Sequence, residues 1–119
     1  MSAPEGISEA RSRLSEALES YVDLAVPAGI SETLEAYAYL ALREAQPETA
    51  AYLVGAASAL RAKVGYHRMT RPRLHASNLK EIRAAMAESA YQRAWSAGAA
   101  HSEAEATSQA LLGFVPAKS

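Results

Sequence analysis

The chain has 119 residues, a length that fits one small domain. Half of the residues are apolar, but 28 of them are alanine and few are β-branched, which favours helices and argues against a sheet. Cysteine is absent, which excludes disulfide scaffolds, thiolate zinc sites and cysteine nucleophiles. No apolar run reaches the roughly 18 residues of a membrane span, and no signal-peptide pattern opens the chain, so we expect a cytoplasmic protein without membrane contact.

Charge is unevenly distributed, although the net charge is only −1. Residues 1–60 carry nine acidic and three basic side chains, whereas residues 61–83 carry seven basic side chains and one acidic one. The sequence therefore has an acidic first half and a basic middle.

The spacing of apolar residues predicts a first helix over residues 8–26, with Ser8 as its N-cap and residues 1–7 as a flexible N-terminus. Pro27-Ala28-Gly29 ends this helix, since proline cannot continue the hydrogen-bond ladder. Ser31 caps a second helix. Its expected inner stripe consists of Leu34, Tyr37, Ala38, Ala41 and Ala45.

A third helix is predicted to begin at Pro47 and to end at Gly65, in the arrangement that helix termini favour. Its expected buried face consists of Ala50, Leu53, Val54, Ala57, Leu60 and Val64. A loop over residues 65–71 then leads to a fourth helix that starts at Pro72.

Two capping boxes predict the remaining helices. Ser89 with Gln92 predicts a break near residues 87–89 and a fifth helix that Gly98 closes. Ser102 with Glu105 predicts a last helix that extends to Gly113. The expected organisation is a single helical domain over residues 8–113 and a flexible tail over residues 114–119.

The predicted fold class is all-α, with five to six helices in antiparallel hairpins, because the connections are short. Residues 31–64 span 34 residues, which is the tetratricopeptide repeat period, and their small and large side chains follow that repeat's intervals. We therefore expect a right-handed, tetratricopeptide-like helical repeat in which small residues such as Gly55 let helix axes approach closely.

A longer pattern resembles a known family. The stretch from Pro47 to Gly65, together with Tyr91, Ala94, Trp95 and Gly98, resembles the C-terminal helical region of bacterial signal-transduction ATPase regulators, some of which carry a LuxR-type or cyclase-like domain. The resemblance extends over residues 31–112. It implies a platform for protein contacts or for signal sensing. It does not carry over ATPase or DNA-binding activity, because the phosphate-binding glycine loop and the DNA-reading helix-turn-helix are missing from this sequence.

The ionisable residues give no pattern of a reaction centre. His67, His75 and His101 lack the helical spacing that places two imidazoles on one face, so we expect no metal site. The glutamates fall on polar faces or in first helical turns, and no nucleophile elbow is present. We expect a non-enzymatic protein without catalytic residues or a cofactor.

Two groups of residues are candidates for binding. The first is an interaction patch in the basic segment, formed by Arg61, Lys63, Tyr66, His67, Arg68, Arg71, Arg73 and Lys80. It could contact nucleic-acid phosphates, but we favour the alternative in which these cations neutralise the acidic first half, within one molecule or across a dimer. The second is a groove for a peptide helix or a small ligand, formed by Tyr39, Tyr52, Tyr91 and Trp95, for which core packing is the alternative.

Because the end helices of a short repeat lack neighbours, we expect the chain to bind a protein partner or to form a homodimer through its first or last helix. The leading functional hypothesis is an interaction or sensory module of a bacterial transcriptional regulatory system. A nucleic-acid-associated protein and a small-ligand-binding domain are the alternatives. Whether the chain is a standalone protein or a fragment stays open.

Overall fold

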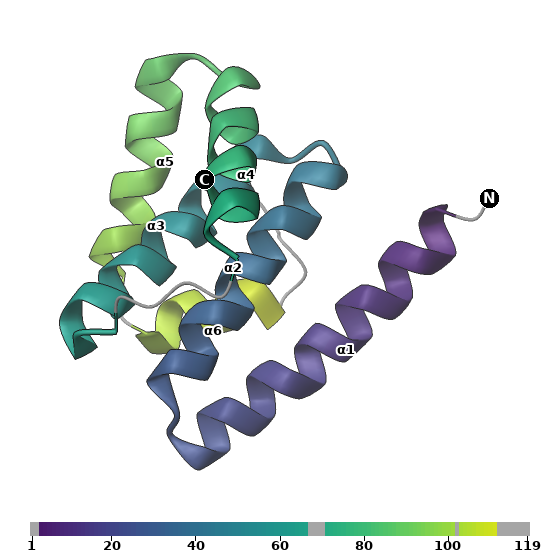
Figure 1. The fold of residues 1–119 in the computed structure, drawn as a ribbon, viewed down its shortest axis with the longest axis vertical. Coiled ribbons are helices and arrows are strands. Elements are labelled where there is room, and N and C mark those ends of the chain that lie inside the picture. The colour runs from purple at the N-terminus through teal and green to yellow at the C-terminus, as the bar shows by residue number, and fades with distance from the viewer. Residues whose placement is uncertain (1–2, 67–70, 102, 112–119) are drawn as a thin grey trace.

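A computed structural model describes residues 3–66, 71–101 and 103–111, and these residues form six α-helices (Figure 1). The all-α prediction is confirmed. In chain order the helices are α1 (Ala3–Leu24), α2 (Pro27–Arg43), α3 (Pro47–Val64), α4 (Pro72–Ala84), α5 (Glu88–Ala100) and α6 (Glu103–Leu111).

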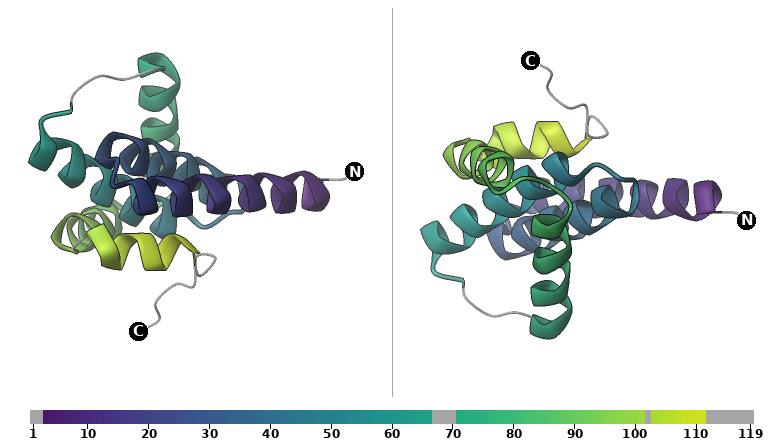
Figure 2. Two further views of the ribbon diagram at one scale, coloured as in Figure 1. Left: turned by 90° about the horizontal axis from the view of Figure 1, so that it is seen from below. Right: turned by 90° about the horizontal axis from the view of Figure 1, so that it is seen from above.

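Helix α3 is the centre of the molecule, because it packs extensively against both α2 and α5. Helix α1 packs beside α2 at one edge, while α5 and α6 cover one face of the α2–α3 pair and α4 stands on the opposite face (Figure 2). The expected hairpins are therefore present for α1–α2 and α2–α3. After α3, helices that follow one another in the chain are no longer the main packing partners, since α5 rather than α4 is the second main neighbour of α3.

The hydrophobic core lies between these helices. The residues that the sequence predicts to face inward on the second and third helices are buried, with one exception in each predicted set. Ala45 is exposed in the turn after α2, and Val64 is 43% exposed at the last residue of α3. The largest apolar side chains that are fully buried are Leu18, Ile30, Leu34, Tyr37, Leu53, Val54 and Ile82.

Proline determines where three of the helices begin. Pro27, Pro47 and Pro72 each occupy the first turn, and none of these starts has a side-chain cap hydrogen bond within the described chain. The fixed φ of proline suits that position. The predicted Ser31 cap is therefore wrong, because α2 begins four residues earlier. Ser31 is instead buried inside α2, where its hydroxyl donates to the carbonyl oxygen of Pro27 at 3.0 Å.

The other predicted boundaries are correct in part. Helix α1 starts at Ala3 rather than at Ser8, so residues 3–7 belong to it. The break before α5 is confirmed, but Ala87 is the N-cap, and the Gln92 amide donates to Glu88 instead of completing a capping box. Gly98 does not end α5, which continues to Ala100. The predicted Ser102 cap, Gly113 and the tail lie outside the described residues.

Two glycines let α3 and α5 touch backbone to backbone. A Cβ at Gly55 would overlap the carbonyl oxygen of Trp95, and a Cβ at Gly98 would overlap the carbonyl oxygen of Tyr52. Each helix thus presents one glycine to the backbone of the other. This reciprocal contact is the close approach that the small residues of the sequence predict.

Replacing either glycine with alanine should destabilise the protein, although alanine is the better helix former. We expect Gly98→Ala and Gly55→Ala each to lower the free energy of unfolding by about 1–3 kcal/mol, because the added methyl group forces the two helices apart. Urea denaturation measures the effect. Gly6→Ala is the matched control, since nothing lies near that position in α1, and it should not destabilise.

Three helices end with a residue in the left-handed conformation. Ala25, Ala45 and Gly65 have φ values of 55°, 61° and 74°. In each case the following residue donates its backbone N–H to a carbonyl five residues earlier, as in Val26 to Tyr21 at 3.0 Å. This is the Schellman arrangement, in which glycine is favoured because it has no Cβ. Two of the three turns therefore carry a strained alanine.

We expect Ala25→Gly and Ala45→Gly each to raise the free energy of unfolding by about 1 kcal/mol, because glycine relieves the left-handed penalty. Gly65→Ala should have the opposite sign, although its Cβ would meet open space. Thermal unfolding of the three variants measures the effect. A loss of stability in both alanine-to-glycine variants would contradict it.

Candidate polar pocket between α2, α3 and α4

The described residues of the basic segment differ in their exposure. Lys63, Arg71, Arg73 and Lys80 are exposed, and Tyr66 is half-buried. Arg61, by contrast, is only 6% exposed, so the expectation that it contributes to a surface patch is wrong. His67 and Arg68 lie outside the described residues.

Arg61 is buried because it forms an ion pair with Glu35 of α2. Its Nε and Nη2 atoms donate to the two carboxylate oxygens of Glu35 at 2.7 and 2.9 Å, in the bidentate geometry that guanidinium and carboxylate groups favour. Both side chains are 8% exposed. These hydrogen bonds raise the pKa of Arg61, which keeps the guanidinium charged. Neutralisation of the acidic first half within one molecule, the alternative that we favour, is therefore observed at this residue.

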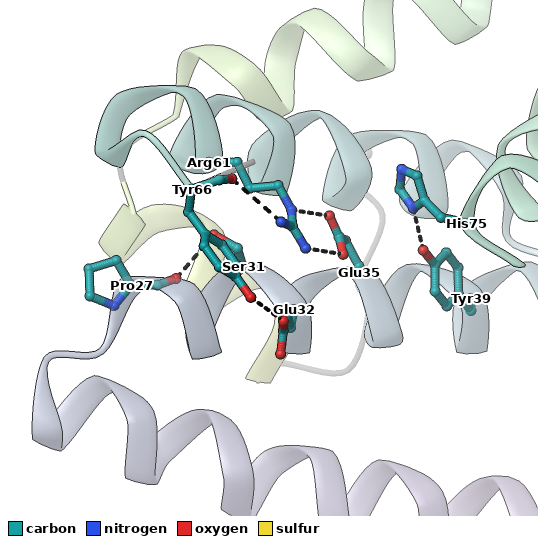
Figure 3. A network of polar contacts seen from close by, with 8 residues as sticks. All are labelled: Pro27, Ser31, Glu32, Glu35, Tyr39, Arg61, Tyr66 and His75. Carbon is teal, nitrogen blue, oxygen red and sulfur yellow. Dashed lines mark hydrogen bonds and ion pairs between the residues drawn. The ribbon is translucent and has the colours of Figure 1, made fainter. Parts of the chain in front are cut away.

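Tyr66 covers this ion pair at the end of α3 (Figure 3). Its ring lies over the Arg61 guanidinium, with 4.8 Å between Cζ and the ring centroid, and its hydroxyl donates to Glu32 at 2.6 Å. A cation over an aromatic face and a hydroxyl on a carboxylate both stabilise their partners. Tyr66, which follows the end of α3, is thereby held against α2.

A second polar contact joins α2 to α4. The hydroxyl of Tyr39 forms a hydrogen bond with Nδ1 of His75, and the two rings meet edge to face (Figure 3). Burial raises the pKa of Tyr39, and the nearby Glu35 carboxylate acts in the same direction. The Tyr39 hydroxyl therefore stays protonated at neutral pH, so it can donate a hydrogen bond to the imidazole. His75, one of the three histidines for which the sequence predicts no metal site, is a hydrogen-bond partner of Tyr39.

These contacts surround a pocket of about 230 Å³. Helix α2 forms one wall, Arg61 lies at the α3 side, and the first turn of α4 forms the other wall. The lining combines two carboxylates, two guanidinium groups and one imidazole with small apolar surfaces. The residues are Glu32, Glu35, Ala36, Tyr39, Arg61, Arg71, Leu74 and His75.

The four residues of the predicted aromatic groove come from three helices, with Tyr39 on α2, Tyr52 on α3, and Tyr91 and Trp95 on α5. Tyr91 and Trp95 lie together on α5, with ring centroids 5.8 Å apart. Tyr52 instead forms a hydrogen bond with His101 at 2.6 Å, and Tyr39 pairs with His75 near α4. Tyr91 is buried, as the packing alternative expects.

Of the pocket residues, only Tyr39, Arg61 and Arg71 are among the predicted binding residues, and sequence reasoning missed the other five, which are Glu32, Glu35, Ala36, Leu74 and His75. The predicted helix start at Ser31 would place Glu35 in the first turn, but α2 begins at Pro27 and Glu35 lies in its middle. One signal was present: Glu35 falls one residue after Leu34 and one helical turn before Ala38, both on the inner stripe. A carboxylate beside such a stripe needs a buried partner.

No family model, curated protein or solved structure matches the chain. Within the described ranges, no three His, Asp or Glu side chains gather in a way that could hold a metal ion. None of the described helices is both long enough and apolar enough to span a bilayer.

The buried ion pair should respond strongly to the loss of one partner. We expect Glu35→Ala or Arg61→Ala to cost about 3–5 kcal/mol, because each leaves a charge buried without its partner. The double replacement by Met should recover most of this loss. Chemical denaturation of the wild type, the two single variants and the double variant tests both statements. The exposed ion pair Glu9–Arg13 is the control, and we expect no measurable coupling energy between its two residues.

Stability should fall in alkali in a manner that depends on Tyr39. Its pKa is raised in the folded chain, so the unfolded chain loses this proton first and stability decreases as the pH rises above about 10. We expect Tyr39→Phe to make the slope of unfolding free energy against pH shallower by up to about 1.4 kcal/mol per pH unit above this point. Parallel curves for the two proteins would contradict the expectation.

Proposed function

We propose that this chain is a non-enzymatic, tetratricopeptide-like module that senses signals or binds proteins in a bacterial transcriptional regulatory system. The observation that supports the proposal is the packing of the segments that resemble those regulators. The stretch from Pro47 to Gly65 falls on α3, and the Tyr91–Gly98 element falls on α5. Gly55 and Gly98 of these two segments meet the opposite backbone directly, so the resembling residues form one packing unit.

The occupant that we propose for the open edge of this module is a second copy of the chain. Helix α1 packs chiefly against α2, which leaves it at the edge of the molecule (Figure 1). Its C-terminal turn exposes apolar side chains, with Val22 39% and Leu24 69% exposed, and Tyr21 lies beside them. Two copies that pair these turns around a twofold axis would cover both sets.

Light scattering coupled to size exclusion tests this assembly. We expect a homodimer, and we expect Val22→Glu combined with Leu24→Glu to convert it to a monomer, because a charge cannot be buried at an apolar contact without a large cost. Ser12→Glu is the matched control, since Ser12 is exposed on the same helix. A wild-type protein that stays monomeric at high concentration would contradict the proposal.

A nucleic-acid contact is the second candidate, and one observation favours it. Arg73 and Lys80 are both exposed on α4, and their spacing of seven residues places them on one face of the helix that stands away from the rest of the fold (Figure 2). Duplex affinity that falls steeply with salt, and that drops when Arg71 and Arg73 are changed to Glu, would support this candidate over a protein partner.

A further inference from the structure

A second pocket, which we call the α6 pocket, lies on the face of α2 and α3 that α5 and α6 cover (Figure 2). Its volume is about 200 Å³. Residues of α2, α3, α5 and α6 line it, together with His101, which follows the end of α5. None of these residues lines the polar pocket beside α4, so the two pockets are separate sites.

The floor of the α6 pocket is apolar. Its apolar lining residues are all buried or half-buried, and most of them are alanines. They are Leu34, Ala56, Ala59, Leu60, Ala99 and Ala106. Because an alanine side chain ends at Cβ, the helices leave a space here that longer side chains would fill. A short apolar chain of a ligand can occupy this space and remove its surface from water.

The mouth of the pocket is polar. The other three lining residues, Lys63, His101 and Glu103, are all exposed. Lys63 and Glu103 carry opposite charges, and no ion pair within the described chain occupies either of them. His101 is held from the side by Tyr52, whose hydroxyl forms a hydrogen bond with Nδ1 of the imidazole at 2.6 Å. The mouth thus offers a ligand one cation and one anion.

These two charges favour an uncharged polar group over an ion. A carboxylate at the mouth would be attracted to Lys63 but repelled by Glu103, and an ammonium group would meet the reverse. An ion would also lose hydration next to the apolar floor, which costs more than for a neutral group. A primary amide can accept a hydrogen bond from an ammonium group and donate one to a carboxylate, so both residues can stabilise it.

We infer that the α6 pocket binds a small uncharged amphiphile, in which a short aliphatic chain ends in a group with both a donor and an acceptor, such as a primary amide. The volume corresponds to about seven waters at about 30 Å³ each, so a ligand of about seven non-hydrogen atoms fits. This inference rests on the proposed sensory role, to which it assigns a class of ligand. Titration reports ligand binding and light scattering reports assembly, so each proposal can fail without the other.

NMR titration of the isotope-labelled wild-type chain tests the class of ligand with four probes. Pentanamide has both parts, pentanoate and pentylamine carry an anion or a cation on a similar chain, and acetamide lacks the chain. We expect pentanamide to bind with a dissociation constant of about 1 mM, and the other three at least about five-fold more weakly. The amides of Ala59, Ala99 and Ala106 should shift most. Equal or tighter binding of pentanoate or pentylamine, or unshifted signals of these amides at about 20 mM pentanamide, would overturn the inference.

Variants of the mouth test the role of the two charges. Glu103→Gln leaves Lys63 unopposed, so pentanoate should bind at least about three-fold more tightly than it binds the wild type. Lys63→Gln should have the same effect on pentylamine. Lys80→Gln is the matched control, since Lys80 is an exposed lysine of α4 that does not line this pocket, and it should change neither affinity. Unchanged affinities in both mouth variants would overturn the assignment of the head group to the mouth.

A larger side chain in the floor should block the aliphatic chain of the ligand. We expect Ala59→Leu to weaken pentanamide binding at least about ten-fold, because leucine fills part of the pocket. Ala62→Leu is the matched control, since Ala62 is exposed on the same helix and does not line the pocket, and it should change the affinity less than about two-fold. Equal affinities of the two variants would overturn the inference. Circular dichroism checks that both fold, and if Ala59→Leu does not, the variants at the exposed mouth positions decide.

Discussion

The contact between α3 and α5 is the constraint on which the arrangement of the other helices depends. Gly55 faces the backbone of Trp95, and Gly98 faces the backbone of Tyr52, so no side chain separates the two helices at these points. Helix α5 therefore occupies one whole face of α3, and no other helix can pack there. Since α2 occupies another face, α4 lies on the remaining side, although it precedes α5 in the chain.

The displacement of α4 creates the polar pocket. Helix α4 is anchored by the fully buried Ile82, whereas its first turn meets α2 through the Tyr39–His75 hydrogen bond. The space between that turn and α2 is lined by the apolar side chains of Ala36 and Leu74 together with charged groups. The Glu35–Arg61 ion pair neutralises two of these charges. A structure with α4 packed between α3 and α5 would have no such space.

The sequence predicts the helices of this protein better than their packing. The prolines at 47 and 72 and the glycine at 65 are local signals, and two helix starts and one helix end are correctly predicted from them. Pro27 is predicted only to end the first helix, whereas it also begins α2. Ser8 and Ser31 are predicted as helix starts but lie inside α1 and α2. Serine can occupy a helix interior when it donates to the carbonyl four residues earlier, as Ser31 does. Local chemistry alone does not distinguish these two uses.

The residues of the polar pocket were predictable only in part, because their positions depend on contacts between residues that are distant along the chain. Arg61 and Glu35 are 26 residues apart, and Tyr39 and His75 are 36 apart. Charge composition placed Arg61 in a surface patch, whereas the register between α2 and α3 buries it opposite a carboxylate. The small residues of α3 did indicate a close helix crossing, but they did not indicate whether α2, α4 or α5 would be the partner.

Native-state hydrogen exchange tests the central role of the α3–α5 contact most directly, because it reports which helices open together. If the glycine contact holds the fold, the slowest amides of α3 and α5 exchange with one common free energy, equal to that of global unfolding. Amides of α4 and of the first turns of α1 should exchange faster. An α5 whose amides exchange well before those of α3 would show that α5 opens on its own, and this would contradict the account.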